Sequence, residues 1–106
     1  MSSPSTSGER EGALDASFAG LPPLVESALH RVALLLHQLT EDASLPRNIR
    51  RGAQGALTEL TRRGVAVDMK VAGTVGLLDE LANDVNLPQH GRTAIWGIIS
   101  QLESLR

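Results

Sequence analysis

The chain contains one short stretch of sequence twice, as DASLPRNIR at residues 42–50 and as DVNLPQHGR at residues 84–92. At an offset of 42 residues, the two copies share an aspartate, a Leu-Pro pair and an arginine. The similarity continues outward on both sides, pairing Leu35, Leu36, Leu39, Gly55 and Leu60 with Leu77, Leu78, Leu81, Gly97 and Leu102. A self-similarity of this length is typical of a duplicated helix-turn-helix unit.

Apolar residues recur at intervals of three and four on both sides of each copy, which predicts amphipathic helices facing a core. The four expected helices cover about 22–41, 46–63, 68–83 and 88–105. Prolines open three of these helices, because the first helical positions need no amide donor. Leu24 is counted among the core residues of the first helix, and Arg62 and Arg63 are placed in the last turn of the second, before a stop at Gly64.

Connections of only a few residues force successive helices to pack antiparallel. The sequence therefore predicts an all-α fold, a four-helix up-and-down bundle built from two duplicated helical hairpins. Stacked hairpins are the alternative, but two repeats are too few for a solenoid to bury its flanks. The bundle domain is expected to cover residues 21–106. Residues 1–20 are rich in Ser, Gly and Thr and are expected to form a disordered tail, with Leu14 and Phe18 as possible anchors.

Five glycines fall inside the expected helices, where each costs about 0.5–1 kcal/mol relative to alanine. They are Gly52, Gly55, Gly73, Gly76 and Gly97. Close approach between helices would offset that cost, and Gly73 with Gly76 is the pair expected to allow it.

Composition narrows the classes of function. The chain has 106 residues, a net charge of −2 and no cysteine, so thiol chemistry is excluded. Its only aromatic residues besides histidine are Phe18 and Trp96, too few for stacking on single-stranded bases. No apolar run approaches the roughly 20 residues that span a bilayer. We expect a soluble cytoplasmic protein that does not enter a membrane.

Several motifs together resemble a known family. They are LPRNIRR at 45–51, LDEL at 78–81, NLP at 86–88, and the run RT, IW, IIS and LE between residues 92 and 103. The combination resembles uncharacterised protein family 0147, a group of small archaeal proteins, over roughly residues 30–105. The resemblance implies a compact four-helix bundle from an archaeal cytoplasm and implies no activity. A looser similarity to HEAT-type repeats, which pair an acidic turn with a following arginine, supports a structural role for the turn.

The repeated turn is interpreted as structural. In each copy an aspartate could accept hydrogen bonds from backbone amides at the next helix start, or pair with the arginine eight residues later. A recognition site for phosphate or carboxylate is the functional alternative, but duplication of a scaffold also duplicates its supports. The turn residues are Asp42, Pro46, Arg50, Asp84, Pro88 and Arg92.

A basic group on the second expected helix is the first candidate interaction surface. It comprises Arg47, Arg50, Arg51, Arg62 and Arg63, opposed within that helix only by Glu59. Arg47 and Arg51 are four residues apart near a helix N-terminus, where anions are favoured, so a phosphate or RNA backbone is one hypothesis. The alternative is a solvated face neutralised by Asp79, Glu80 and Asp84.

Trp96 is the second candidate, because the first copy carries Gln54 at the aligned position. It either fills the flank of the core or marks a contact surface. The histidines His30, His37 and His90 lack the spacing of a metal site, and no nucleophile or cofactor motif is present. We therefore expect a non-enzymatic protein–protein interaction module without cofactor, binding a partner protein or itself through Trp96. The alternative is an RNA- or ribosome-associated accessory protein using Arg47, Arg51, Arg62 and Arg63.

Overall fold

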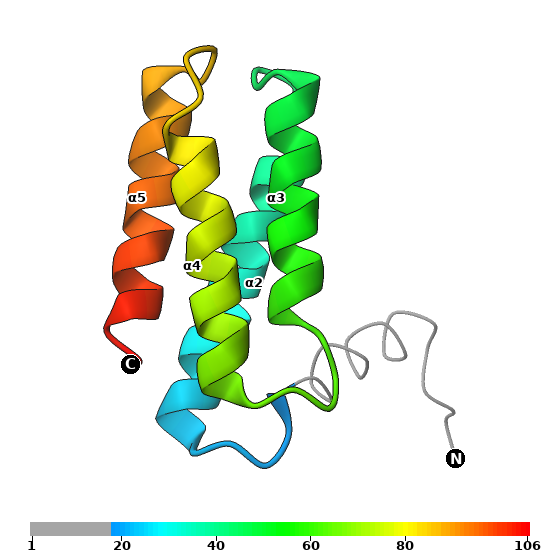
Figure 1. Ribbon diagram of the computed structural model, residues 1–106, viewed down its shortest axis with the longest axis vertical. Helices are drawn as coiled ribbons and strands as arrows, with labels where there is room; N and C mark the ends of the chain where they lie inside the picture. Colours follow the sequence, from blue (N-terminus) through cyan, green and yellow to red (C-terminus); the bar gives the residue numbers. More distant parts are fainter. Residues whose placement is uncertain (1–17) are drawn as a thin grey trace, which may run out of the picture.

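The structure, a computed structural model, describes residues 18–106. This part of the chain contains four α-helices and no strand (Figure 1). The helices are α2 (Pro23–Thr40), α3 (Arg47–Leu60), α4 (Val67–Ala82) and α5 (Gln89–Glu103). The all-α prediction is confirmed. Residues 1–17 of the expected tail lie outside the described residues.

Three of the helices begin directly after a proline with extended backbone angles. Pro22, Pro46 and Pro88 are the N-cap residues of α2, α3 and α5, with φ between −54° and −62° and ψ between 143° and 156°. The ring fixes φ near this value and removes an amide that would have no helical partner. The sequence therefore located these helix starts to within one residue.

The end of α3 differs from the prediction. The helix stops at Leu60, and both the amide and the hydroxyl of Thr61 donate to the Leu57 carbonyl, at 3.0 and 2.8 Å. The chain then reverses through Gly64, whose φ of +75° is a conformation that glycine adopts without strain. Arg62 therefore lies in the connection to α4 rather than in the last turn of α3, and so does Arg63.

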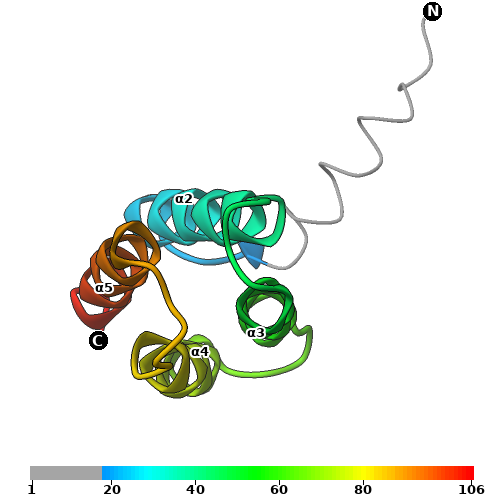
Figure 2. The ribbon, with the colours of Figure 1, turned by 90° about the horizontal axis from the view of Figure 1, so that it is seen from above.

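The four helices run alternately up and down and are arranged in a ring (Figures 1 and 2). The backbones of α2 and α3, of α3 and α4, of α4 and α5, and of α5 and α2 approach closely, whereas among the described helices the diagonal pairs do not. The α3–α4 contact is the most extensive and the α2–α5 contact the least.

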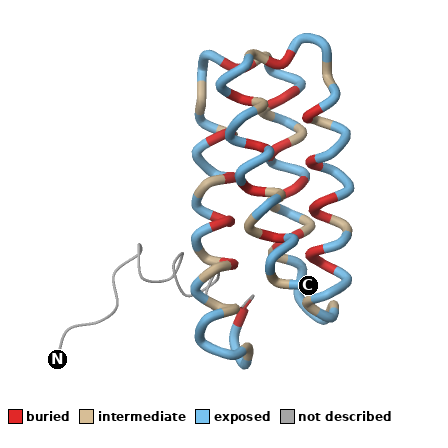
Figure 3. Tube along the Cα trace, turned by 90° about the vertical axis from the view of Figure 1, so that its left-hand side faces the viewer, coloured by how far each residue is buried: buried red, intermediate tan, exposed pale blue. Residues whose placement is uncertain are grey.

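Each helix turns one apolar side toward the centre of the ring, so buried positions recur along all four (Figure 3). The expected core residues Val32, Ile49 and Leu78 are buried. The prediction that Leu24 belongs to the core is wrong, since 86% of this residue is exposed. The buried set also extends beyond the predicted domain boundary at Leu21. Phe18 is fully buried and meets the His30 ring edge-on at a centroid distance of 4.9 Å. Phe18, one of the two possible anchors of the expected tail, therefore packs on the body of the domain.

The two repeated turns pack against each other at one end of the ring. Leu45 and Leu87, one from each turn, are both buried. A Cβ atom on Gly91 would lie 2.9 Å from the Leu45 side chain and 2.8 Å from the Leu87 side chain, so this glycine makes the close packing possible. The stretch that organises the sequence thus also forms one physical end of the domain.

Candidate functional site

The aspartate of each turn first stabilises its own turn. Asp42 Oδ1 accepts a hydrogen bond from the Ser44 amide at 2.9 Å, and Asp84 Oδ1 accepts one from the Asn86 amide at 2.8 Å. These are the local side-chain bonds typical of aspartate in turns. Backbone amides do bind the two carboxylates as expected, but the donors lie within the turns and not at the next helix start.

The same aspartates then bond across to the other copy. Asp84 Oδ2 accepts from the Asn48 side-chain amide at 2.9 Å, while Asp42 Oδ2 lies 3.5 Å from His90 Nε2. Asn48 and His90 are aligned positions in the two copies. Each turn is therefore braced by the helix that follows the other turn. Sequence reasoning missed these pairs, although the polar residues at the aligned positions were a usable signal.

Arg92 does not pair with the carboxylate of its own turn. Its Nε donates to the Ala82 carbonyl at 3.1 Å and its Nη2 donates to the Asp84 carbonyl at 3.3 Å, so it satisfies carbonyls at the end of α4. The carboxylate of Asp84 is already bound by Asn48 and Asn86. The predicted pairing of the Asp84 carboxylate with Arg92 is therefore wrong. Arg50, at the aligned position, has a buried Nε without a hydrogen-bond partner among the described residues.

An aspartate, a serine and a histidine meet at the first turn, and their geometry decides their role. Ser44 Oγ donates to Asp42 Oδ1 and lies 2.9 Å from His90 Nε2. In a catalytic triad the histidine takes the serine proton while the aspartate holds its other nitrogen. Here the serine proton is directed at the carboxylate, and Ser44 and Asp42 both face the same nitrogen. These bonds, with the Ser44 hydroxyl first, lower the pKa of Asp42 below its ordinary value of 3.8.

The basic group is divided by the structure. Arg47 is the first residue of α3 and Arg51 lies one turn further, whereas Arg62 and Arg63 follow the other end of the helix. At 1.5 Å per residue, the two pairs are separated by about 20 Å along the axis. Of the arginines in this basic group, only Arg62 has an acidic partner among the described residues, Glu59 at 3.3 Å. The expected single arginine face is therefore wrong.

Trp96 lies near the middle of α5, and 55% of it is exposed. The core-flank interpretation therefore does not hold for most of this side chain. The interpretation as a contact surface has the geometry it requires, namely a large aromatic side chain on a well-formed helix and open to solvent.

A groove of about 370 Å³ runs between α2 and α5, and sequence reasoning missed it. We call it the α2–α5 groove; it is lined by Leu35, Gln38, Leu39, Asp42, Thr93, Ala94, Gly97, Ile98 and Gln101. Asp42 is the one charged residue of this lining. The Oε1 atom of Gln101 is buried, and no donor among the described residues reaches it. The groove itself therefore offers a mainly apolar lining with one carboxylate.

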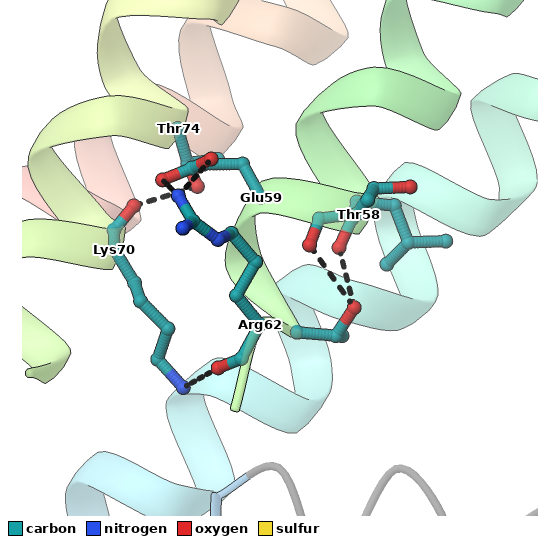
Figure 4. Close-up of polar contacts among 7 residues, drawn as sticks. Thr58, Glu59, Arg62, Lys70 and Thr74 are labelled. Carbon is teal, nitrogen blue, oxygen red and sulfur yellow. Dashed lines mark hydrogen bonds and ion pairs between the residues drawn. The ribbon is translucent and has the colours of Figure 1, made fainter. Parts of the chain in front are cut away.

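Lys70 is an unexpected buried residue at the opposite end of the ring from the two turns. Only 3% of it is exposed, and its Nζ donates to the Arg62 carbonyl at 3.0 Å (Figure 4). The Phe18 ring centroid lies 5.5 Å from this Nζ. Burial lowers the pKa of this amine. Lys70 ties α4 to the connection that follows α3 and to Phe18, which gives it a structural role.

The part of the chain that the structure describes contains no group of three or more acidic, histidine or cysteine side chains that could hold a metal ion. None of its helices combines the length and the apolar character needed to cross a membrane.

A family model described as an uncharacterised protein family, UPF0147, matches residues 23–105. The chain belongs to the UPF0147 family. This match confirms the family that the sequence motifs indicated. A UPF0147 protein from the archaeon Thermoplasma volcanium is 40% identical over 80 residues, covering 76% of this chain and 90% of the relative. One from Saccharolobus solfataricus is 35% identical over 81 residues, covering 76% and 91%.

Two crystal structures resemble the fold. The UPF0147 protein of Thermoplasma acidophilum has a TM-score of 0.74 and 38% identity, covering 76% of this chain and 95% of that one. A protein of unknown function has a TM-score of 0.72 and 27% identity, covering 100% of this chain and 99% of that one. The UPF0147 match includes all four helices, both repeated turns and both walls of the α2–α5 groove, while Phe18 precedes it. The family is uncharacterised, so membership assigns no activity.

Proposed function

We propose that this UPF0147 protein is a small non-enzymatic interaction module that binds a protein chain through the outer surface of α5, with Trp96 as its main contact. The observation that carries the proposal is the 55% exposure of Trp96 on a regular helix. Large aromatic side chains are enriched among the few residues that dominate binding energy at protein interfaces.

The proposal assigns no catalysis. Where Asp42, Ser44 and His90 meet, the serine proton is directed at the carboxylate, which suits a support for the turn better than a nucleophile. No cofactor is part of the proposal. A cytoplasmic location, expected from the sequence, stays a prediction.

The test compares Trp96→Ala with Met69→Ala in affinity purification from a lysate of the source cells. Met69 is a matched control because it is a large apolar residue, 64% exposed, on a different helix. We expect Trp96→Ala to weaken capture of the partner by about tenfold or more, and Met69→Ala to leave it unchanged. Equal capture by both variants and the wild type would remove Trp96 from the interface.

RNA is the second candidate, favoured by one observation. Arg47 and Arg51 are exposed beside each other on α3, and neither has an acidic partner among the described residues. RNA binding would be abolished by nuclease and weakened both by salt and by the double change Arg47→Glu and Arg51→Glu. Capture with that pattern, and indifferent to Trp96→Ala, would replace the protein-interaction proposal with this one.

A further inference from the structure

Trp96 lies on the edge of α5 that borders α4, away from the α2–α5 groove. Arg92, one turn earlier in the same helix, donates to the carbonyls of Ala82 and Asp84 at the end of α4. Residues four apart on a helix share a side, so Trp96 follows Arg92 along this edge. In the ring of helices, α4 and α2 lie on different sides of α5 (Figure 2). The surface around Trp96 and the groove are therefore separate.

Asp79 occupies the matching edge of α4. Leu81 marks the other edge of this helix, because its side chain packs where Gly52 of α3 leaves room. Residues two apart on a helix project about 160° apart. Asp79 therefore lies on the edge of α4 that borders α5, and it is exposed there.

Trp96 and Asp79 also lie at a similar level of the bundle. The helices α4 and α5 are antiparallel, and Arg92 of α5 reaches the Ala82 carbonyl of α4 (Figure 1). Moving four residues along each helix from this contact shifts the position by about 6 Å, to Trp96 on α5 and to Leu78 on α4. Asp79 directly follows Leu78. Trp96 and Asp79 are therefore neighbours across the outer side of the α4–α5 hairpin.

Both groups are open to a partner. More than half of Trp96, 55%, is exposed, and Asp79 has no ion-pair partner among the described residues. Gly76 lies three residues before Asp79 and is also exposed, and a Cβ atom on it would meet nothing within 4 Å. The outer side of the hairpin therefore has room for a side chain that contacts the indole and the carboxylate together.

The charge of the hairpin indicates which partner fits. Residues 67–103, which form α4, the second turn and α5, contain five acidic and two basic residues, a net charge of −3 with histidine neutral. The two basic side chains, Lys70 and Arg92, are directed at backbone carbonyls. A polyanion such as RNA is repelled by this charge, whereas a cationic protein segment is attracted.

The first hairpin shows that the fold does not require this pair. At the positions aligned with Trp96 and Asp79, α3 carries Gln54 and α2 carries His37, and both are exposed. A pair needed for packing the hairpin would be expected in both copies, as the Leu-Pro pair of the turn is. The combination of tryptophan and aspartate in one copy alone is typical of a recognition surface.

We infer that the outer side of the α4–α5 hairpin binds an arginine-bearing segment of another protein, with a guanidinium group stacked on the Trp96 indole and paired with the Asp79 carboxylate. A guanidinium stacks on aromatic faces and forms two parallel hydrogen bonds with a carboxylate, which the compact ammonium of lysine does not. Trp96 and Asp79 together supply both contacts. The inference rests on the proposed function and specifies the chemistry of its partner.

The probe for this inference is a random library of short peptides displayed on phage and selected on the full chain. Soluble Trp96→Ala protein is present in excess, because it removes peptides that bind elsewhere on the molecule. We expect the selected peptides to be enriched in arginine relative to lysine. Trp96 is the only tryptophan in the chain, so its fluorescence reports the binding of each peptide directly.

Two carboxylates on α4 provide a matched comparison. Asp79→Asn and Asp68→Asn each remove one exposed negative charge, but Asp68 is 11 residues from Asp79, which is about 16 Å along the helix. We expect the dissociation constant of an arginine peptide to rise about tenfold or more for Asp79→Asn and to stay within about twofold for Asp68→Asn. Circular dichroism checks that both variants are helical. Peptides without arginine enrichment, or equal dissociation constants for the two variants, would overturn the inference.

Other outcomes separate this inference from the proposed function. Selected peptides that are apolar or acidic overturn the inference and leave Trp96 as a protein contact. Self-association in sedimentation equilibrium that is lost in Trp96→Ala does the same, because the occupant is then a second copy of the chain. If no peptide is selected and no protein is captured from a lysate in a Trp96-dependent manner, both the inference and the proposed function are overturned.

Discussion

Two contacts between helices, which we call the α3–α4 seam and the α2–α5 seam, occupy equivalent places in the sequence repeat, because α3 aligns with α5 and α4 aligns with α2. Yet α3 and α4 pack closely, while α2 and α5 leave a groove. The closed seam has a glycine on each helix. A Cβ atom on Gly52 would overlap the Leu81 side chain, and one on Gly73 would lie 2.7 Å from Glu59. The open seam has Ala94 and Arg31 at the aligned positions. The closed seam and the open seam therefore differ at these two positions, which carry glycine in the closed seam and larger residues in the open one.

The largest expected effect comes from forcing the closed seam open. Gly52→Leu places a branched side chain where Leu81 now packs, and we expect a loss of about 1–3 kcal/mol in the free energy of unfolding. Gly55→Leu, one turn along the same helix in open space, is the control and should lose nothing. Urea unfolding followed by circular dichroism measures both. Equal stabilities would show that Gly52 does not determine the closeness of this seam.

A smaller and opposite effect is expected where the helices have room. Gly55→Ala and Gly97→Ala should each raise the free energy of unfolding by about 0.5–1 kcal/mol, because alanine is favoured in a helix and both sites are open. In a domain of this size that gain raises the melting temperature by about 2–8 °C. Gly73→Ala should gain less, since Glu59 must move. A gain at Gly73 equal to that at Gly97 would contradict the difference between the seams.

The smallest expected effect concerns the turn at the end of the open seam. The lowered pKa of Asp42 means that its ionised form stabilises the folded chain. That contribution is fully present above the ordinary value of 3.8 and is lost as the pH falls through the folded-state pKa. The difference in stability between the wild type and Asp42→Ala should therefore be present at neutral pH and shrink below that value. Urea unfolding at several pH values measures it.

A second variant isolates the role of histidine at this turn. His90→Asn gives the first turn the same type of partner that Asn48 provides to Asp84. It should retain a cross-turn hydrogen bond while removing the electrostatic contribution of the His90 charge to the lowered pKa of Asp42. A pH dependence identical to that of the wild type would show that the charge of His90 does not contribute to the lowered pKa of Asp42.

The sequence predicted the elements of the fold because the signals for them are local. Pro46 and Pro88 fix the backbone of the residues that start α3 and α5, and the apolar periodicity of each helix selects its buried side. Where a local signal was ambiguous, the prediction failed. Leu24 continues the apolar pattern of α2 but lies near its first turn, where no neighbouring helix covers it.

The candidate site depended on contacts between distant segments. Arg62 and Arg63 looked continuous with Arg47 and Arg51 until the end of α3 at Leu60 separated them. The partner of Asp42 is 48 residues away in the chain, and that of Asp84 is 36 residues away. Neither pairing follows from spacing along a helix, because both require the two turns to meet.

By itself, the sequence determined that this protein is all-α, where its helices begin, which residues form most of its core, and that it belongs to UPF0147. The tertiary structure alone decided that Phe18 and Lys70 are buried, that Trp96 is exposed, and that only one of two aligned seams is open. Helix formation follows from residues within a few positions of one another. The closeness of two helices depends on which side chains meet across them, and those side chains come from distant parts of the chain.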